Sequence, residues 1–250
     1  MARSSQIGKI LRRRMQKPVK KTGPLWRKPL AIRDRIVGEV CKQLRGAYGA
    51  PRLGNPKDPL DDLVYVVVSN KTSAQMARLT YRRLKARFES WDEVLATGSK
   101  VLRPILKPAG LSEVKAKQLR AAFKKIREDF GKCDLRALRQ RSEGDVHEYL
   151  VGLPGVSDKV AKCVMMYTMG ASVLPVDAHV HRIATRLGWT ARRRADQSHE
   201  ELEALVPPDF RYAFHVGCVL HGRKICRPEK PACQQCCINH SCEYFRKLHA

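Results

Sequence analysis

The sequence predicts an all-α protein built from many short helices. Apolar residues recur at helical spacing along most of the chain, and no segment keeps the alternating pattern of a half-buried strand. Helix-capping patterns also recur, at Ser90–Glu93 and at Ser198–Glu201. With 250 residues, 43% of them hydrophobic and 6% aromatic, the chain can form one large domain or two modest ones.

The chain is strongly basic: 49 Lys and Arg residues face 24 Asp and Glu residues, a formal net charge of +25. Such an excess predicts a polyanionic partner, and nucleic acid is the commonest one. An anionic membrane surface is the alternative, but it predicts a basic amphipathic helix with aromatic anchors, and aromatic residues are scarce. No apolar run approaches the length that spans a bilayer, so we expect a soluble protein with no membrane partner.

Residues 1–30 contain ten Lys or Arg residues and no acidic residue. This composition predicts a flexible basic arm that lies along a phosphate backbone. An acid-free, arginine-rich start is also typical of an organelle transit peptide. We favour the arm and a cytoplasmic or nucleoid location, while organelle targeting stays open.

Helices are expected in order from about Ile32, where apolar residues at helical spacing run until Gly46 and Gly49. A loop follows at 54–59. The next segment, "LVYVVVSN", is β-branched and could be a strand or a buried helix, and its helical neighbours favour the helix. A helix rich in Ala, Arg and Leu is expected over 73–89, and the capping box at Ser90 opens another.

The second half of the chain continues this pattern. Ser112 is expected to cap a long helix that ends at Gly131, and residues 142–145 start another. A helix, a tight turn and a second helix follow over 150–163, and a further helix spans 178–189 after the turn "LPVD". The prolines at 207–208 are expected to break the chain before a last apolar helix.

The turn in "LPGVSDKVAKC" (153–163) carries the first functional signal. Gly155 permits a backbone that other residues resist, and the helix that starts near Asp158 leaves free N–H groups suited to a phosphate oxygen. This resembles the helix-hairpin-helix DNA-binding element. Lys159 lies in the first helical turn, where the helix dipole and partial burial disfavour its charged form, and a neutral lysine amine is a nucleophile that forms Schiff bases. An ordinary exposed lysine is the alternative.

A second motif strengthens the case for Lys159. "LPVDAHVHR" places Asp177 directly before a helix, a position that the N-cap role alone can explain. Together, the Leu-Pro-Gly-Val turn, Lys159 four residues after its Gly and Val-Asp-x-His-Val-x-Arg eighteen residues later resemble the helix-hairpin-helix base-excision DNA glycosylases. In that family the lysine attacks the sugar of a damaged nucleotide and the aspartate assists. The resemblance implies these catalytic roles for Lys159 and Asp177.

Five of the nine cysteines crowd into residues 226–242. Four have the spacing C-x6-C-x2-C-x5-C, enough to bind one metal centre. This spacing is similar to the 4Fe–4S loop of endonuclease III and adenine glycosylases, which implies that Cys237 is a bystander. Zinc is the alternative, but zinc sites usually use two short-spaced pairs. The expected ligands are Cys226, Cys233, Cys236 and Cys242, and the basic residues expected to meet DNA nearby are Lys224, Arg227 and Lys230.

The resemblance covers roughly residues 30–245 and implies two all-α domains with a DNA-binding groove between them. A six-helix barrel with the helix-hairpin-helix is expected over 60–170. The second domain is expected to combine 31–59 with 171–250, including the cluster loop at 226–242. The basic arm at 1–30 has no counterpart in this resemblance.

The sequence also departs from the endonuclease III pattern. Lys71 stands where a Gln usually fills the gap left by the extruded base, and lysine favours the N7 and O6 acceptors of guanine over an adenine edge. Ser157 replaces a second Gly of the hairpin, and its hydroxyl is expected to cap the next helix and weaken phosphate binding. Leu111 matches the position from which some relatives insert a wedge into the base stack, or it is an ordinary apolar residue.

The function expected from the resemblance is a bifunctional DNA glycosylase with abasic-site lyase activity, acting as a monomer on double-stranded DNA that carries a damaged base or an abasic site. Oxidised pyrimidines are the default substrate, while "KVAKC" is also similar to 8-oxoguanine glycosylases. The alternatives are a non-catalytic iron–sulfur DNA-binding protein and a zinc-stabilised nucleic-acid binding module.

Overall fold

A computed structural model of the protein describes residues 25–249, so most of the expected basic arm lies outside the described residues. Within that range the chain is all-α, as predicted, and no β-strand occurs. The elements, in order, are η1 (Leu25–Arg27), α2 (Leu30–Tyr48), α3 (Pro59–Ser69), α4 (Ala74–Arg87), α5 (Trp91–Ala96), α6 (Ser99–Leu106), η2 (Lys107–Ala109), α7 (Ser112–Phe130), η3 (Arg136–Gln140), α8 (Glu143–Gly152), α9 (Asp158–Val164), η4 (Met165–Met169), α10 (Ala178–Leu187), η5 (Ala195–Gln197), α11 (His199–Leu205), α12 (Pro208–Lys224), η6 (Cys233–Gln235), η7 (Asn239–Ser241) and α13 (Glu243–Leu248).

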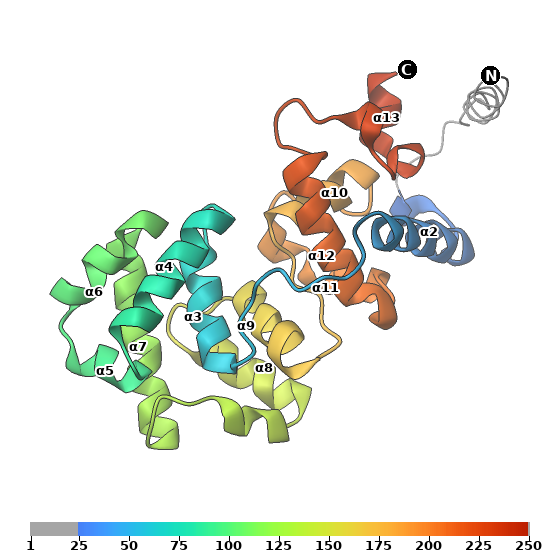
Figure 1. Cartoon of the computed structure of the whole chain (residues 1–250). Helices are drawn as coiled ribbons and strands as arrows, with labels where there is room; N and C mark the ends of the chain where they lie inside the picture. Colours follow the sequence, from blue (N-terminus) through green and yellow to red (C-terminus); the bar gives the residue numbers. More distant parts are fainter. Residues whose placement is uncertain (1–24, 250) are drawn as a thin grey trace, which may run out of the picture.

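The helices form two groups, each around its own apolar core (Figure 1). The first core draws on residues 60–173 and on Val216, so α3–α9 surround it. The second core draws on residues 25–44 and on 174–242, and it is enclosed by α2 and α10–α13. The chain therefore enters the second group, leaves it to build the first group, and returns.

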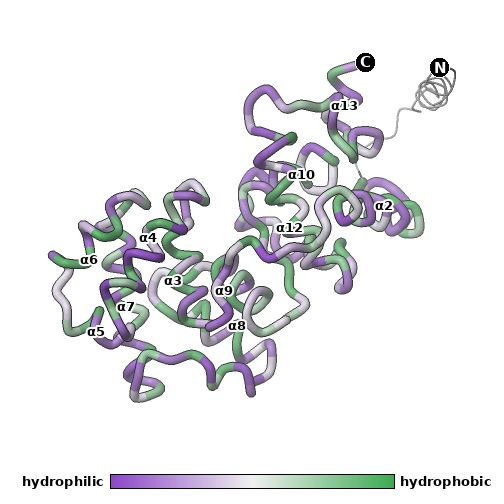
Figure 2. The backbone as a smooth tube through the Cα atoms, viewed as in Figure 1, coloured by the Kyte–Doolittle hydropathy of each residue, from purple (hydrophilic) through white to green (hydrophobic). Residues whose placement is uncertain are grey.

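Helix α3 is the central element of the first core. Its residues from Leu60 to Val68 are almost all buried, and Figure 2 shows its strongly hydrophobic course. The β-branched run is a helix because Asp58 accepts hydrogen bonds from the N–H groups of Leu60 and Asp61, and Pro59 occupies the first helical turn. A helix that is apolar on all sides suits a position surrounded by other helices.

The second core joins the two ends of the described chain. Helix α2 packs along α12, and Val37, Val40, Cys41 and Leu44 of α2 are fully buried there. A Cβ at Gly217 of α12 would lie 3.1 Å from Leu44 Cβ, so the absence of a side chain at this position allows the close helix contact. Among the described residues no helix is both long and apolar enough to cross a bilayer.

Several predicted helix starts are confirmed and others are wrong. The capping box of Ser90 and Glu93 is present, and Gly131 ends α7 in the left-handed conformation. Ser112 does not cap α7, because left-handed Leu111 occupies that position and no side chain caps the helix. The hydroxyl of Ser198 also makes no cap bond and instead donates to the Ala195 carbonyl. The prolines at 207–208 separate α11 from α12, as predicted, and Pro208 already lies in the first turn of α12, where its missing N–H would have no helical partner.

Candidate active site

A cleft of about 760 Å³ collects side chains from both groups of helices. Five of the residues singled out in the sequence line it, namely Lys71, Leu111, Ser157, Lys159 and Asp177. They come from the N-terminal ends of α7, α9 and α10 and from the turn that follows α3, segments that are separated along the chain. The cleft is therefore the place where the separate sequence signals meet.

Lys159 reaches the cleft from the second position of α9, just after the hairpin turn. Gly155 makes this turn with a φ of 78°, and a Cβ there would lie 2.6 Å from Gln118 Cγ on α7. Glycine is required on both counts, since the left-handed backbone and the close approach each exclude a side chain. The Lys159 side chain is half-buried, and its Nζ donates a hydrogen bond to Asn70 Oδ1 at 3.0 Å.

Asp177 is the N-cap of α10, as its position predicted. Its Oδ1 accepts the N–H groups of His179 and Val180, each at 2.8 Å. Burial raises the pKa of Asp177, but nearby His215 and His179, the Val180 N–H and Lys159 outweigh it and hold the pKa below its ordinary value of 3.8. At neutral pH the cleft therefore contains a carboxylate.

Two histidines lie beside this carboxylate. His215 of α12 is 3% exposed, and its Nδ1 donates to the Pro175 carbonyl at 2.9 Å. Burial lowers the pKa of His215, although Asp177 acts in the opposite direction. His179 accepts a hydrogen bond at Nδ1 from Arg182 at 3.0 Å, and burial likewise lowers its pKa. Both imidazoles are therefore favoured in their neutral forms beside a charged aspartate.

A second carboxyl, Asp62 of α3, is fully buried in the first core. Its Oδ1 accepts a hydrogen bond from Asn55 Nδ2 at 2.7 Å, and its Oδ2 has no hydrogen-bond partner among the described residues. Burial raises the pKa of Asp62 to about 8, while Asn55, Arg52 and Lys159 lower it. A carboxyl in this environment is neutral at pH 7, unlike Asp177.

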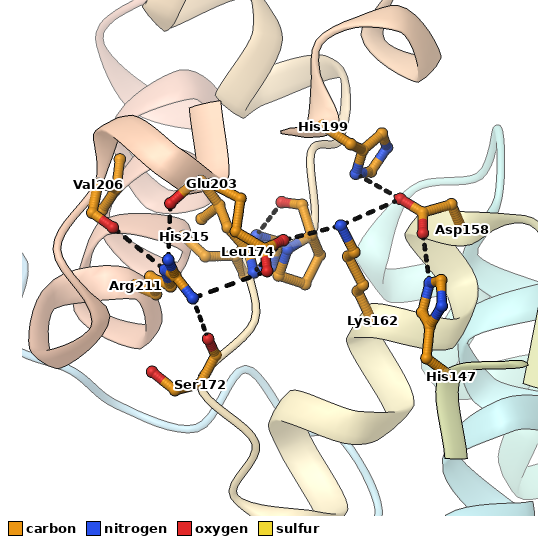
Figure 3. Close-up of polar contacts among 11 residues, drawn as sticks. His147, Asp158, Lys162, Ser172, Leu174, His199, Glu203, Val206, Arg211 and His215 are labelled. Atoms are coloured by element: carbon orange, nitrogen blue, oxygen red, sulfur yellow. Dashed lines mark hydrogen bonds and ion pairs between the residues drawn. The ribbon is translucent and has the colours of Figure 1, made fainter. Parts of the chain in front are cut away.

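A polar network connects the helix that carries Lys159 to the second group of helices (Figure 3). Asp158 lies 2.5 Å from His147 Nε2 on α8 and 2.8 Å from His199 Nδ1 on α11. Lys162 of α9 pairs with Glu203 of α11 at 2.7 Å. Burial raises the pKa of Asp158, but His199, His147 and Lys162 hold it well below its ordinary value. The network therefore ties the start of α9 to α11.

The expected effect of Ser157 is wrong in one respect. Ser157 is the N-cap residue of α9, but its hydroxyl makes no cap hydrogen bond. The N–H groups of this turn are therefore not occupied by the serine. The predicted weakening of phosphate contact has no structural cause in the described residues.

The cysteine loop lies between α12 and α13, against the second core. All of its cysteines are free thiols. Burial raises the pKa of Cys236 to about 12, and it also raises the pKa values of Cys233 and Cys242. Electrostatic repulsion from Cys226 raises all three pKa values further. These thiols would lose their protons only beside a positive centre, and Arg186 already donates to Cys226 Sγ at 3.1 Å. Within residues 25–249, no three Cys, His, Asp or Glu side chains converge closely enough for a single metal ion.

The three basic residues near this loop do not line the cleft. Lys224 ends α12 and is exposed. Arg227 donates to the Lys230 carbonyl at 3.2 Å, and Lys230 has a φ of 46°. They lie on the loop surface, apart from the residues that surround Lys159.

Several residues of the cleft carried no sequence signal. Asn70 was not among the predicted site residues, although it contacts Lys159. His179 lies inside the Val-Asp-x-His motif, which could have indicated it. His215 comes from an apolar helical segment, and no motif marks it.

Comparisons with known proteins agree with this geometry. Residues 64–208 match the family of HhH-GPD superfamily base excision DNA repair proteins. Endonuclease III of Thermotoga maritima is 29% identical over 85% of this chain and 94% of its own length. Endonuclease III of Escherichia coli is 27% identical over 78% of this chain and 88% of its own.

Solved structures share the fold. The structure of a non-covalent endonuclease III–DNA complex superposes with a TM-score of 0.76 at 21% identity, covering 86% of this chain and 98% of that one. A thermostable thymine-DNA glycosylase gives a TM-score of 0.73 at 22% identity, covering 86% of this chain and 98% of its own. The chain therefore belongs to the HhH-GPD superfamily of base excision DNA repair proteins, as an endonuclease III-like DNA glycosylase.

Proposed function

We propose that this glycosylase is bifunctional, and that it excises an oxidised pyrimidine through Lys159 and then cleaves the strand at the resulting abasic site. The observation that carries the proposal is the meeting of Lys159 and Asp177 in one cleft, from helices of different groups. The amine supplies a nucleophile and the carboxylate supplies a fixed negative charge. A DNA-binding protein without catalysis has no use for this pair.

The chemistry starts with extrusion of the damaged nucleotide into the cleft, at an unstacking cost of about a few kcal/mol. The Lys159 lone pair forms a bond to C1′ as the C1′–N bond to the base breaks and its electron pair leaves with the base. Asp177, ionised at neutral pH, stabilises the positive charge that develops on the sugar.

The departing base takes up a proton and the lysine nitrogen loses one. The nitrogen lone pair then forms a C=N bond to C1′ as the C1′–O4′ bond breaks and O4′ takes up a proton, which leaves the opened sugar on Lys159 as a protonated Schiff base. Removal of a C2′ proton sends that electron pair into a C2′–C3′ double bond, and the C3′–O bond breaks with loss of the 3′ phosphate. Hydrolysis of the imine returns the free lysine. Neutral His179 and His215 lie beside Asp177 and suit proton movement at this stage.

The proposed cofactor is a 4Fe–4S cluster held by Cys226, Cys233, Cys236 and Cys242. The four free cysteines, the electrostatic repulsion between Cys226 and the other three, and the N–H···S contact from Arg186 support this assignment. A bound cluster would supply a rigid cross-link of the loop that carries Arg227 and Lys230 and follows Lys224. We propose these three residues as phosphate contacts. Visible absorbance distinguishes the cluster from zinc, because a zinc protein is colourless.

The roles proposed for Lys71 and Leu111 follow from their exposure at the cleft. Leu111 is 53% exposed, which favours the wedge over an ordinary apolar residue. Lys71 has an exposed side chain and a φ of 53°, and it lines the cleft. We propose that Leu111 enters the base stack and that Lys71 faces the unpaired partner base, with a preference for guanine. The hairpin turn at Gly155 and Ser157 is the proposed phosphate contact.

Borohydride trapping on duplex DNA with an abasic site tests the proposal. The wild type should form a covalent protein–DNA adduct, and Lys159→Ala should form none. Lys159→Arg is the matched control, since it keeps a cation near Asn70 and cannot form a Schiff base at that position. A wild type that binds the duplex and leaves no adduct, or an adduct that persists in both variants, would contradict the lysine mechanism.

A further inference from the structure

Lys115, on the first turns of α7, is a buried lysine that the proposed chemistry does not use. It is 2% exposed, and no described acidic side chain forms an ion pair with it. Its Nζ donates instead to the carbonyls of Val68, at 2.7 Å, and Ala109, at 2.8 Å, and to the hydroxyl of Thr72, at 3.1 Å. Burial lowers the pKa of Lys115 to about 8, so this placement is costly for an ammonium.

The three acceptors belong to two different turns. Val68 and Thr72 bracket the turn after α3, which carries Asn70 and Lys71. Ala109 ends η2, directly before the turn that leads through Leu111 into α7. The Thr72 hydroxyl also donates to the Ala109 carbonyl. A single ammonium group therefore fastens two turns that are distant along the chain.

Both turns hold a residue in an unfavourable backbone conformation. Lys71 has a φ of 53° and Leu111 a φ of 48°, and among the described residues only one other non-glycine, Lys230, has a positive φ. Such a conformation persists only where the surrounding structure fixes it. The side chains of Lys71 and Leu111 are both exposed at the cleft that contains Lys159.

We propose that Lys115 is a positioning residue that fixes Lys71 and Leu111 relative to each other, so that the two side chains enter opened DNA as one unit. This inference rests on the proposed function, because it concerns the step at which the duplex opens. It adds a residue of the cleft lining whose three donor groups are all directed to the two turns. The three donor groups of one ammonium suit this task, since an apolar residue would bury more cheaply but would hold neither turn.

The test uses a duplex with a tetrahydrofuran abasic analogue opposite 2-aminopurine, whose emission rises when the base loses its stacking. The analogue cannot form a Schiff base, so this signal is independent of Lys159 chemistry. The wild type should raise the emission at saturating protein, and Lys115→Met should raise it at least fivefold less. Lys115→Met keeps the length of the side chain and removes its donors. Thr72→Val, which removes one partner, should give an intermediate emission.

Arg120→Met is the matched control for loss of stability. Arg120 lies on the same helix and also donates to carbonyls, those of Val94, Leu95 and Thr97, but it does not line the cleft. The Arg120→Met substitution should lower the melting temperature of the protein and leave the 2-aminopurine emission at saturating protein unchanged. Equal emission from Lys115→Met and the wild type, or an equal loss from Arg120→Met, overturns the inference.

Trapping on a single-stranded abasic oligonucleotide separates the two proposals. That substrate needs no duplex opening, so Lys115→Met should trap within twofold of the wild type. A wild type that raises the emission and traps nothing refutes the lysine chemistry and leaves the role of Lys115 standing. If Lys115→Met loses the same fraction of the trapped adduct on single-stranded and on duplex abasic substrates, the positioning role is refuted.

Discussion

The Nζ atom of Lys159 lies 3.0 Å from Oδ1 of Asn70, so the proposed nucleophile touches the turn that carries Lys71. A neutral amide accepts this hydrogen bond without adding negative charge. Asn70 is therefore suited to orienting the amine of Lys159 without stabilising its protonated form. The identity of residue 70 should matter for the chemistry as well as for the turn.

Replacing Asn70 with Asp should slow the reaction at neutral pH. A carboxylate 3 Å from Nζ would favour the charged ammonium, which cannot attack C1′. We expect trapping on abasic duplex to fall by about tenfold at pH 7 and to recover as the pH is raised. Asn70→Ala should lose less activity and keep the wild-type pH profile. Superimposable profiles for Asn70→Asp and the wild type would contradict this role.

Asp177 serves both as a helix cap and as a charge in the cleft, and two substitutions separate these roles. Asn is as good an N-cap as Asp, so Asp177→Asn should fold normally and lose excision by about 100-fold or more. Asp177→Ala should lose the same activity and about 1 kcal/mol of unfolding free energy. Single-turnover excision and urea unfolding measure the two effects. An active Asp177→Asn protein would restrict the residue to capping.

Asp62 should make the protein less stable as the pH rises. Its pKa is about 8 in the folded protein and 3.8 ordinarily, so the folded state holds a proton that the unfolded state releases. The favourable contribution of this residue is complete below pH 3.8 and is lost as the pH rises to about 8. Asp62→Asn should therefore be the more stable protein at pH 8.5, by roughly 1–3 kcal/mol, and close to the wild type at pH 4. Urea unfolding at both pH values measures the difference, and parallel curves would show that the carboxyl is ionised in the fold.

Lys71 should set the preference for the partner base. Excision opposite guanine and opposite adenine, measured for the wild type and for Lys71→Gln, gives two ratios. The substitution should lower the guanine-to-adenine ratio. Lysine favours the N7 and O6 acceptors of guanine, whereas the amide of glutamine forms hydrogen bonds with the edge of adenine. An unchanged ratio would remove Lys71 from recognition.

Gly155 should tolerate no side chain while Gln118 faces it. Gly155→Ala should destabilise the protein by about 1–3 kcal/mol, because the new Cβ would meet Gln118 Cγ at 2.6 Å and the φ of 78° disfavours alanine. Gln118→Ala in the same chain should restore part of this loss by removing the collision. A double variant no more stable than Gly155→Ala would assign the whole cost to the backbone.

The sequence predicted the features that depend on local chemistry. The helical spacing indicated the all-α fold, and the capping box at Ser90 and the N-cap at Asp177 are confirmed. Lys159 and Asp177 were found through a motif rather than through geometry. Their meeting in one cleft depends on how α9 and α10 pack, which no local pattern encodes.

The features that the sequence did not predict depend on tertiary contacts. Ser112 has the side chain of an N-cap, but the turn fixed by Lys115 places Leu111 at that position instead. Lys115 itself resembles any other lysine of a basic helix until its burial is known. His215 likewise lies in an apolar helix, and only the packing of α12 brings it close to Asp177.

The return of the chain to the second group of helices, where it began, has a consequence for synthesis. Helix α2 leaves the ribosome early, with Val37, Val40, Cys41 and Leu44 uncovered, and its partner α12 is not made until residues 208–224. Most of the first core, residues 60–173, is complete well before that point. Because domains fold as units while the chain grows, we expect a nascent chain to pass through a state in which the first group of helices is folded and α2 has no partner. Translation that stalls before α12 would leave the apolar face of α2 exposed, so that a chaperone could bind it or the chain could aggregate.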